Sequence, residues 1–214
     1  MYHYQDRKKR VFKRLILKIR SMLTERQEEI IETAIELIDS KGIQGLTIKN
    51  LSKKIGISEP AIYRHFDSKI HILTTVLEML KKGSENVYNV KIAKNENAVE
   101  KITNLFESHF KMFTEKPVFA SVIFSEELFQ NETVLKAKVA EVINHNNEIL
   151  ISIIQTGQKK NEIRKDIKAD DLAILIMGTL RLYVKKWQLS GLSFNLKQEG
   201  ARIIEMIKTL IEKK

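Results

Sequence analysis

The side chains best able to perform chemistry are few and scattered along this chain. It contains five histidines, at positions 3, 65, 71, 109 and 145, and no cysteine. Without cysteine there is no disulfide, no thiolate nucleophile and none of the usual structural zinc sites. The histidines show no HxxxH spacing, and neither a Ser/His/Asp arrangement nor a glycine-rich phosphate loop is present. The sequence therefore predicts a protein that is not an enzyme and has no metal or cofactor.

The segment 47–69 instead carries side chains suited to binding a polyanion. Its basic residues outnumber its acidic ones: Lys49, Lys53, Lys54, Arg64 and Lys69 against Glu59 and Asp67. The net charge of +10 is less informative, because residues 1–20 hold +7 of it while residues 21–80 carry −2. The local arrangement, rather than the bulk charge, indicates nucleic acid.

Residues 47–66 must position these groups, and their pattern predicts two short helices around a tight turn. Thr47 can cap the first helix and Ser58 the second, with Pro60 in the first turn of the second. Gly56 lies where the chain must turn sharply. In the second helix, Ile62 and Phe66 would face the core and leave the intervening residues outside. This is a helix-turn-helix, whose second helix suits a DNA major groove.

These residues resemble the DNA-binding domain of the TetR family of bacterial transcriptional regulators. The matching positions are Thr47, Gly56, Ser58, Pro60, Tyr63, His65, Phe66, Ser68 and Lys69. An apolar helix before them, ending at Lys41 and Gly42, also resembles the family. The specific match covers about residues 25–80, and beyond it only the helical pattern and the length are similar.

The resemblance implies DNA-contacting roles for individual residues. Thr47, Tyr63, His65 and Lys69 would bind backbone phosphates, and Ser58 would begin the recognition helix. Base edges would be read by Lys49, Glu59, Pro60 and Ala61. Arg64 is a further candidate base contact, at a position where the family varies. Two alternatives remain open: Glu59 only favours the helix dipole, and Tyr63 is only a packed surface aromatic.

The remaining pattern predicts an all-α protein. Only two prolines and eight glycines interrupt long stretches with helical periodicity. We expect helices at about 24–41, 47–55, 59–65, 69–90, 97–115, 118–130, 132–159, 170–189 and 195–212. They would form a DNA-binding domain at 23–80 and a larger helical effector-binding and dimerisation domain at 81–214. No run approaches the roughly 18 apolar residues of a membrane span, so a cytoplasmic protein without a membrane partner is expected.

The basic N-terminal extension, residues 1–22, allows several interpretations. It pairs an apolar stripe, which includes Phe12, Ile16 and Ile19, with basic residues on the remaining positions. Translation that begins at Met22 would make the extension an artefact of the start site. Otherwise it is a basic arm facing DNA, or an amphipathic helix on a membrane or a partner.

Two apolar sets in the larger domain are candidate sites. Aromatic clustering predicts an effector pocket at Phe106, His109, Phe110, Phe113, Phe124 and Leu128. The last two helices carry more apolar residues than they could bury alone, and Ile174 and Leu182 are part of this surplus. The surplus predicts a dimer interface at Met177, Leu180, Trp187, Ile203, Ile207 and Leu210. Both sets have the same alternative, which is intramolecular core.

The resemblance therefore implies a ligand-responsive, homodimeric transcriptional regulator, usually a repressor. It would bind a pseudo-palindromic operator of double-stranded DNA and be released by a small, mostly apolar effector. The alternative is an architectural or adaptor protein that binds DNA without a small-molecule switch. The sequence identifies neither the effector nor the operator.

Overall fold

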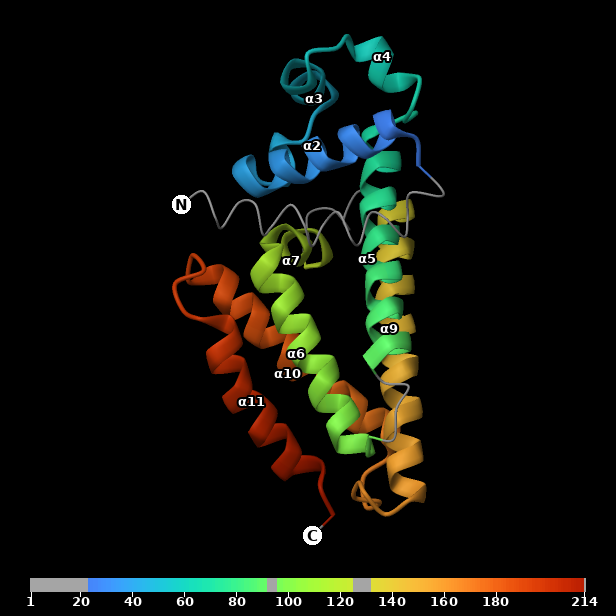
Figure 1. Cartoon of the computed structure of the whole chain (residues 1–214), viewed down its shortest axis with the longest axis vertical. Coiled ribbons are helices and arrows are strands. Elements are labelled where there is room, and N and C mark those ends of the chain that lie inside the picture. Colours follow the sequence, from blue (N-terminus) through green and yellow to red (C-terminus); the bar gives the residue numbers. More distant parts are fainter. Residues whose placement is uncertain (1–22, 92–95, 125–131, 214) are drawn as a thin grey trace. The chain divides into compact units, whose positions relative to one another are not determined.

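The computed structural model describes residues 23–91, 96–124 and 132–213. Within these residues the chain is helical and contains no β-strand (Figure 1). The elements are α2 (Glu25–Lys41), η1 (Ile43–Gly45), α3 (Ile48–Ile55), α4 (Glu59–Tyr63), α5 (Lys69–Lys91), α6 (Ala98–Glu115), α7 (Pro117–Ile123), α9 (Thr133–Lys159), α10 (Ala169–Leu189) and α11 (Leu196–Ile211). The all-α class expected from the sequence is confirmed.

The predicted helices agree with the observed ones to within a residue or two at most ends. Capping residues explain the agreement, because Thr24, Asn97 and Asn195 each accept a hydrogen bond from a backbone N–H in the first turn. The helix expected at 118–130 is described only as α7, and residues 125–131 lie outside the described part. The N-terminal extension, residues 1–22, also lies outside it. The short 3-10 helix η1 was not predicted.

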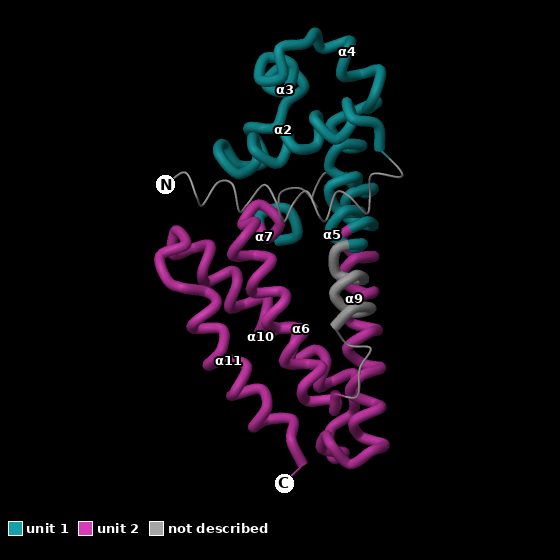
Figure 2. The backbone as a smooth tube through the Cα atoms, viewed as in Figure 1, with its two compact units in different colours: residues 1–83, 121–138 teal, residues 84–120, 139–214 magenta. Residues whose placement is uncertain are grey.

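The chain divides into two compact units, drawn in different colours in Figure 2. The first takes the residues up to Gly83 together with Ser121–Lys138, and the second takes Ser84–Ala120 and Val139–Lys214. Helices α5, α7 and α9 each contribute residues to both units. The first unit therefore contains a segment from the middle of the chain in addition to the helix-turn-helix.

The first unit is built on the apolar face of α2. Its buried residues follow helical spacing: Ile30, Ile31, Ala34, Ile35, Leu37 and Ile38. Gly42 ends this helix with φ +68°, a backbone conformation that favours glycine. The chain then passes through η1 to α3, and both pack against α2.

The mid-chain segment is tied to α5 within the first unit. Ile72, Leu73, Val76 and Leu77 of α5 are buried. Lys138, near the start of α9, forms an ion pair with Glu78 of α5 at 3.2 Å. Because Glu78 is half exposed, this pair contributes little stability, and apolar burial is the main cohesive force.

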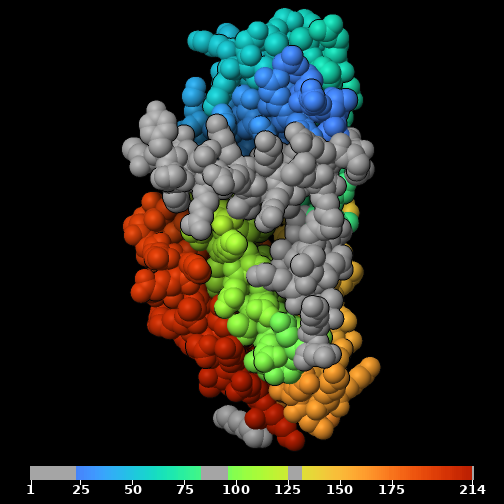
Figure 3. All heavy atoms as spheres, in the orientation of Figure 1, coloured from blue at the N-terminus to red at the C-terminus, as the bar shows by residue number. Residues whose placement is uncertain are grey.

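The core of the second unit lies between α6 and α11, with α10 beside them. Side chains of α11 lie directly against those of α6 on the face shown in Figure 3. Close approach is possible because α11 carries Gly200 at the contact. A Cβ there would lie 2.5 Å from Cδ2 of Phe110, so a larger residue would displace a buried ring.

A second close contact joins the start of α6 to the end of α9. A Cβ at Gly157 would lie 2.5 Å from Cβ of Ala98. The amide of Ala98 donates to Glu162 Oε2 at 2.7 Å, which fixes this end of α6 to the turn after α9. These contacts define where the two helices meet.

None of the helices in the described part of the chain is both long enough and apolar enough to cross a membrane.

Candidate nucleic-acid interface

The turn between α3 and α4 has the geometry that its residues predict. Gly56 adopts φ +80° and ψ 29°, and its amide donates to the carbonyl of Ser52 at 2.9 Å. Ser52 is nearly buried, and its small side chain donates to the carbonyl of Lys49 at 2.9 Å. Two compact residues therefore allow α4 to pack closely on α3.

Helix α4 presents one face to the core and the other to solvent. Ser58 caps it by accepting from the amide of Ala61 at 3.3 Å, and Pro60 lies in its first turn. Ile62 and, just beyond the helix, Phe66 are almost fully buried, as expected. The opposite face exposes Glu59, Pro60, Tyr63 and Arg64, with Ala61 half-buried.

The residues expected to bind phosphate lie around this exposed face. Tyr63 is 49% exposed, which leaves its hydroxyl available, and Thr47 caps α3 by accepting from Asn50 N at 3.0 Å. His65 is half-buried, and its carbonyl accepts from Gln27 Nε2 at 3.3 Å, which fixes the end of the recognition segment to α2. Lys69 is also half-buried and donates to the carbonyl of Ile43 at 3.4 Å.

The residues expected to bind phosphate carry hydrogen-bond donors and lie around the exposed face of α4. Lysine, tyrosine and threonine side chains and helix N-termini are common phosphate partners in protein–DNA complexes. Lys69 begins α5, so its ammonium and the first amides of that helix belong to the same region. The contact with Ile43 orients the Lys69 side chain and involves one of the three donors of its ammonium. The DNA-contacting roles themselves stay predictions.

Glu59 and Lys49 provide the test for base reading, since both side chains are exposed at the starts of α4 and α3. Substitution of either by Ala should relax sequence preference at one or two base pairs in each half-site. The preferred sequence should lose roughly 1–3 kcal/mol of binding free energy per contact. Selection of binding sites from random DNA measures this. An unchanged base preference in both variants would remove them from the reading surface.

The aromatic cluster predicted as an effector pocket lies largely within the second unit and is densely packed. Phe106, Phe110 and Phe113 are at most 2% exposed, and the rings of Phe106 and Phe110 meet edge to face at 5.9 Å. Phe110 also approaches Tyr183 at 6.2 Å between ring centroids. Phe124 is buried in the first unit, and Leu128 lies outside the described residues. A pocket at these residues stays a prediction.

His109 is the polar member of this cluster. It is 7% exposed, and its ring Nδ1 lies 2.9 Å from the carbonyl of Leu105. Burial lowers the pKa of His109 below 6.5, and the hydrogen bond to Leu105 opposes this only in part. The imidazole is therefore neutral at pH 7, with Nδ1–H as the donor and Nε2 as an acceptor.

The lowered pKa of His109 predicts an acid-dependent loss of stability. As the pH falls through the ordinary histidine range, the unfolded chain binds more protons at this site than the folded chain does, so stability decreases. The slope cannot exceed about 1.4 kcal/mol per pH unit for one group. Urea denaturation at pH 7.5 and 5.5 should show a smaller difference for His109→Gln than for the parent protein. Equal differences would contradict this assignment.

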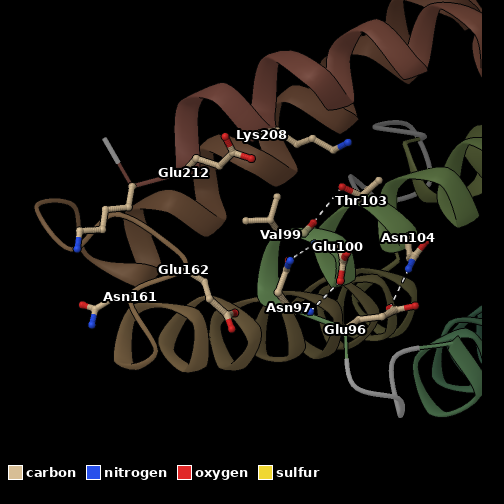
Figure 4. A pocket seen from close by; sticks show the side chains of 11 residues that line it. Glu96, Asn97, Val99, Glu100, Thr103, Asn104, Asn161, Glu162, Lys208 and Glu212 are labelled. Carbon is tan, nitrogen blue, oxygen red and sulfur yellow. Dashed lines mark hydrogen bonds between the residues drawn. The ribbon is translucent and has the colours of Figure 1, made fainter.

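A hollow of about 740 Å³ lies on the second unit and has a different lining (Figure 4). Four glutamates and two lysines are among its residues. Glu100 accepts from the amide of Asn97 at 2.9 Å, and Glu96 accepts from Asn104 Nδ2 at 2.9 Å. These carboxylates therefore serve the start of α6, and the hollow lacks the apolar lining expected for the effector.

Helices α10 and α11 expose a set of large apolar side chains, here called the α10–α11 face. Its members are Ile174, Leu175, Leu182 and Leu189 of α10, and Met206 and Leu210 of α11. The four residues of α10 fall within roughly 100° of one another around the helix, so they form one stripe. Gly178 lies in the same stripe, and a Cβ there would have no neighbour within 4 Å.

The predicted interface residues divide between this face and the core. Leu180, Trp187, Ile203 and Ile207 are at most 8% exposed within the single chain. Met177 is half-buried, and Leu210 is 43% exposed. Leu175, Leu189 and Met206 were not identified from the sequence, although their helical spacing from Ile174 and Leu210 was the available signal.

Two family descriptions match the chain. "Bacterial regulatory proteins, tetR family" matches residues 30–76, which include α3 and α4. "YsiA-like protein, C-terminal region" matches residues 79–210, more than half of the chain.

Curated relatives cover most of the chain at low identity. The fatty acid metabolism regulator protein of Bacillus subtilis (strain 168) is 23% identical over 191 residues, which are 87% of this chain and 95% of that protein. The nucleoid occlusion factor SlmA of Actinobacillus pleuropneumoniae serotype 5b (strain L20) is 24% identical over 190 residues, 88% of this chain and 93% of its own length.

Solved structures share the fold. The fatty acid degradation regulator FadR from Bacillus halodurans aligns with a TM-score of 0.77 at 20% identity, covering 86% of this chain and 95% of its own. FadR from Bacillus subtilis, in complex with stearoyl-CoA, aligns with a TM-score of 0.74 at 23% identity, covering 84% and 96%. These neighbours are transcriptional regulators and not enzymes, in agreement with the sequence. The helix-turn-helix geometry and the two family matches together show that the chain belongs to the tetR family of bacterial regulatory proteins.

Proposed function

We propose that this protein is a homodimeric, ligand-responsive transcriptional repressor of the bacterial cytoplasm. It binds a pseudo-palindromic DNA operator and leaves it when a small, mostly apolar effector binds the second unit. The observation that carries the proposal is α4, a helix capped by Ser58 and held by buried Ile62, which exposes Glu59, Tyr63 and Arg64 on one face. Such a face is suited to a major groove.

The relatives support a fatty-acyl effector. The Bacillus subtilis relative is a fatty acid metabolism regulator, and a FadR of similar fold is known with stearoyl-CoA. The buried aromatic cluster at Phe106, His109, Phe110 and Phe113 lies in the second unit, and we assign it as the lining that an alkyl chain would contact. Binding there requires the packed rings to move apart, which makes the site ligand-induced.

The α10–α11 face supports the homodimer. Six large apolar side chains on it are between 43% and 78% exposed in the single chain. Their summed exposed area is roughly the 800 Å² that each partner contributes to a stable interface of standard size. Gly178 leaves space for a second helix to approach closely. A twofold pairing through this face would set the separation of two recognition helices.

Release from DNA follows from the coupling of two binding equilibria. Helix α5 begins at Lys69 beside the proposed DNA face, and its later residues belong to the second unit. An effector that favours a different position of α5 would change the spacing of the two heads and lower operator affinity. Linkage then requires operator DNA to weaken effector binding by the same factor.

A second candidate function is supported by the SlmA relatives. These nucleoid occlusion factors match the chain as extensively as the fatty acid regulator does. In this reading the protein binds DNA without a small-molecule switch. The two candidates differ in whether any effector changes operator affinity.

Binding-site selection followed by ligand release tests the proposal. Sites selected from random DNA should be pseudo-palindromic, and stearoyl-CoA should lower the affinity measured by fluorescence anisotropy. Stearoyl-CoA and free stearate that both leave operator affinity unchanged would favour the second candidate. The absence of any selected site would contradict both.

A further inference from the structure

The side-chain amide of Gln27 is hydrogen-bonded at both of its ends. Its Oε1 accepts from the backbone N–H of Thr24 at 3.0 Å, and its Nε2 donates to the carbonyl of His65 at 3.3 Å. The first bond belongs to the capping box at the start of α2, in which Thr24 Oγ1 accepts in return from the amide of Gln27 at 3.3 Å. The second bond leaves α2 and reaches a residue 38 positions further along the chain.

Only a side chain with both an acceptor and a donor can form these two bonds. A capping box needs an acceptor at this position, and glutamate supplies one as well as glutamine does. An ionised glutamate has no donor, so it could not also bind the carbonyl of His65. The two bonds require the same orientation of the amide, because the opposite one would place oxygen against oxygen and N–H against N–H. The contact with His65 is therefore a property of glutamine that the cap of α2 does not need.

The recognition segment to which Gln27 is bonded depends on contacts with the rest of the first unit. Helix α4 has only five residues, Glu59–Tyr63, and so short a helix is not stable alone. Beyond it the amides of His65 and Phe66 donate to the carbonyl of Ile62 at 2.9 and 3.0 Å. Burial of Ile62 and Phe66 holds one side of the segment. Gln27 supplies a polar contact at its end, where carbonyls have no partner within the helix.

The carbonyl that Gln27 holds lies close to two residues assigned to phosphates. One is His65 itself, and the other is Tyr63, which is exposed at the last position of α4. In Figure 1 the start of α2 lies beside the chain that leads from α4 to α5, as this hydrogen bond requires. A group that is already ordered loses less conformational entropy when it binds. Fixing the peptide of His65 therefore lowers the entropy lost when phosphate is bound.

We propose that Gln27 is a positioning residue for DNA binding, which holds Tyr63 and His65 in the orientation that meets backbone phosphates. The inference rests on the proposed function, because it concerns the same DNA-binding face. Gln27 acts through the carbonyl of His65 and not through a base. It therefore raises the affinity for all DNA sequences alike.

Three substitutions separate the contact with His65 from the cap of α2. Gln27→Glu keeps the acceptor for Thr24 and removes the donor to His65. Gln27→Met removes both and adds no charge. Thr24→Ala removes the Oγ1 acceptor of the capping box and leaves the donor of Gln27 in place. At pH 8 the melting temperature should fall in Gln27→Met and Thr24→Ala. It should stay at the parent value in Gln27→Glu, because glutamate retains the cap and suits the helix dipole.

Operator affinity of the full-length proteins, measured by fluorescence anisotropy, should rank the variants differently. Gln27→Glu and Gln27→Met should each bind about threefold to tenfold more weakly per half-site, the effect of one lost hydrogen bond. Thr24→Ala should bind as the parent does. Methionine is uncharged, so a loss shared by both Gln27 variants cannot come from repulsion by DNA. Binding-site selection should return the parent base preference. Affinities that instead follow the melting temperatures, or an altered base preference, would overturn the inference.

Hydrogen exchange in the DNA-free protein provides a measurement that does not depend on the operator. The amides of His65 and Phe66 should exchange about threefold to tenfold faster in both Gln27 variants, because local opening no longer breaks the bond to Gln27. They should exchange at the parent rate in Thr24→Ala. Parent rates in both Gln27 variants would overturn the positioning role by themselves. A parent protein that selects no DNA would contradict the proposed function, and the exchange rates would identify that case separately.

Discussion

Replacement of Leu182 by glutamate is expected to separate the proposed dimer into monomers and to weaken operator binding by about a hundredfold or more. Leu182 is 72% exposed in the single chain and lies in the apolar stripe of α10. In a twofold interface a central charge is buried together with its own copy, which is strongly unfavourable. Each half-site would then be bound independently. Light scattering measures the mass, and anisotropy with labelled operator measures the affinity.

Two further substitutions make this result specific. Val134→Glu changes another exposed apolar residue, 59% exposed on α9 and outside the α10–α11 face, and should leave the dimer intact. Ile207→Glu, which the sequence alone indicates as an interface change, introduces a charge at a residue that is 5% exposed in the single chain. It should therefore reduce the stability of the protomer itself. A Leu182→Glu protein that remains dimeric with full operator affinity would exclude the α10–α11 face.

Leu182 and Ile207 have the same apolar character in the sequence but different surroundings in the fold. Apolar periodicity predicts that a helix has a buried face, but the partner on that face can be the same chain or a second copy. On α11, Ile203 and Ile207 pack inside the chain. Met206 and Leu210 lie on the adjacent side of the same helix and are exposed. The sequence gives both pairs the same apolar character. Only the three-dimensional packing of α6 on α11 separates them.

The helix-turn-helix was predictable in detail because its signals are local. Thr47 and Ser58 form the expected caps, Gly56 has the positive φ that its position requires, and Ile62 faces the core. Each of these depends on residues within one or two turns. The neutral state of His109 depends instead on contacts between distant helices, and the sequence could identify this residue only as an isolated polar one.

Removal of the Lys69 ammonium and the Tyr63 hydroxyl is expected to weaken binding to every DNA sequence. Both groups are assigned to phosphates, which carry no sequence information. Hydrogen bonds to a charged group contribute about 1.5–3 kcal/mol, so Lys69→Ala with Tyr63→Phe should lose at least that much in each half-site. Lys69→Ala alone should also reduce the dependence of log K on log salt by about one unit per half-site.

Lys69 has a second role that the experiment must separate from DNA binding. Its Nζ donates to the carbonyl of Ile43 at 3.4 Å, so Lys69→Ala also removes a contact between α5 and the segment after α2. A long contact of this kind stabilises little, and thermal melts should show a nearly unchanged protein. Lys159→Ala removes the same charge at the exposed end of α9 and should leave the salt dependence unaltered. If the Lys69→Ala protein keeps the parent salt dependence but prefers different bases, Lys69 reads sequence and the phosphate assignment fails.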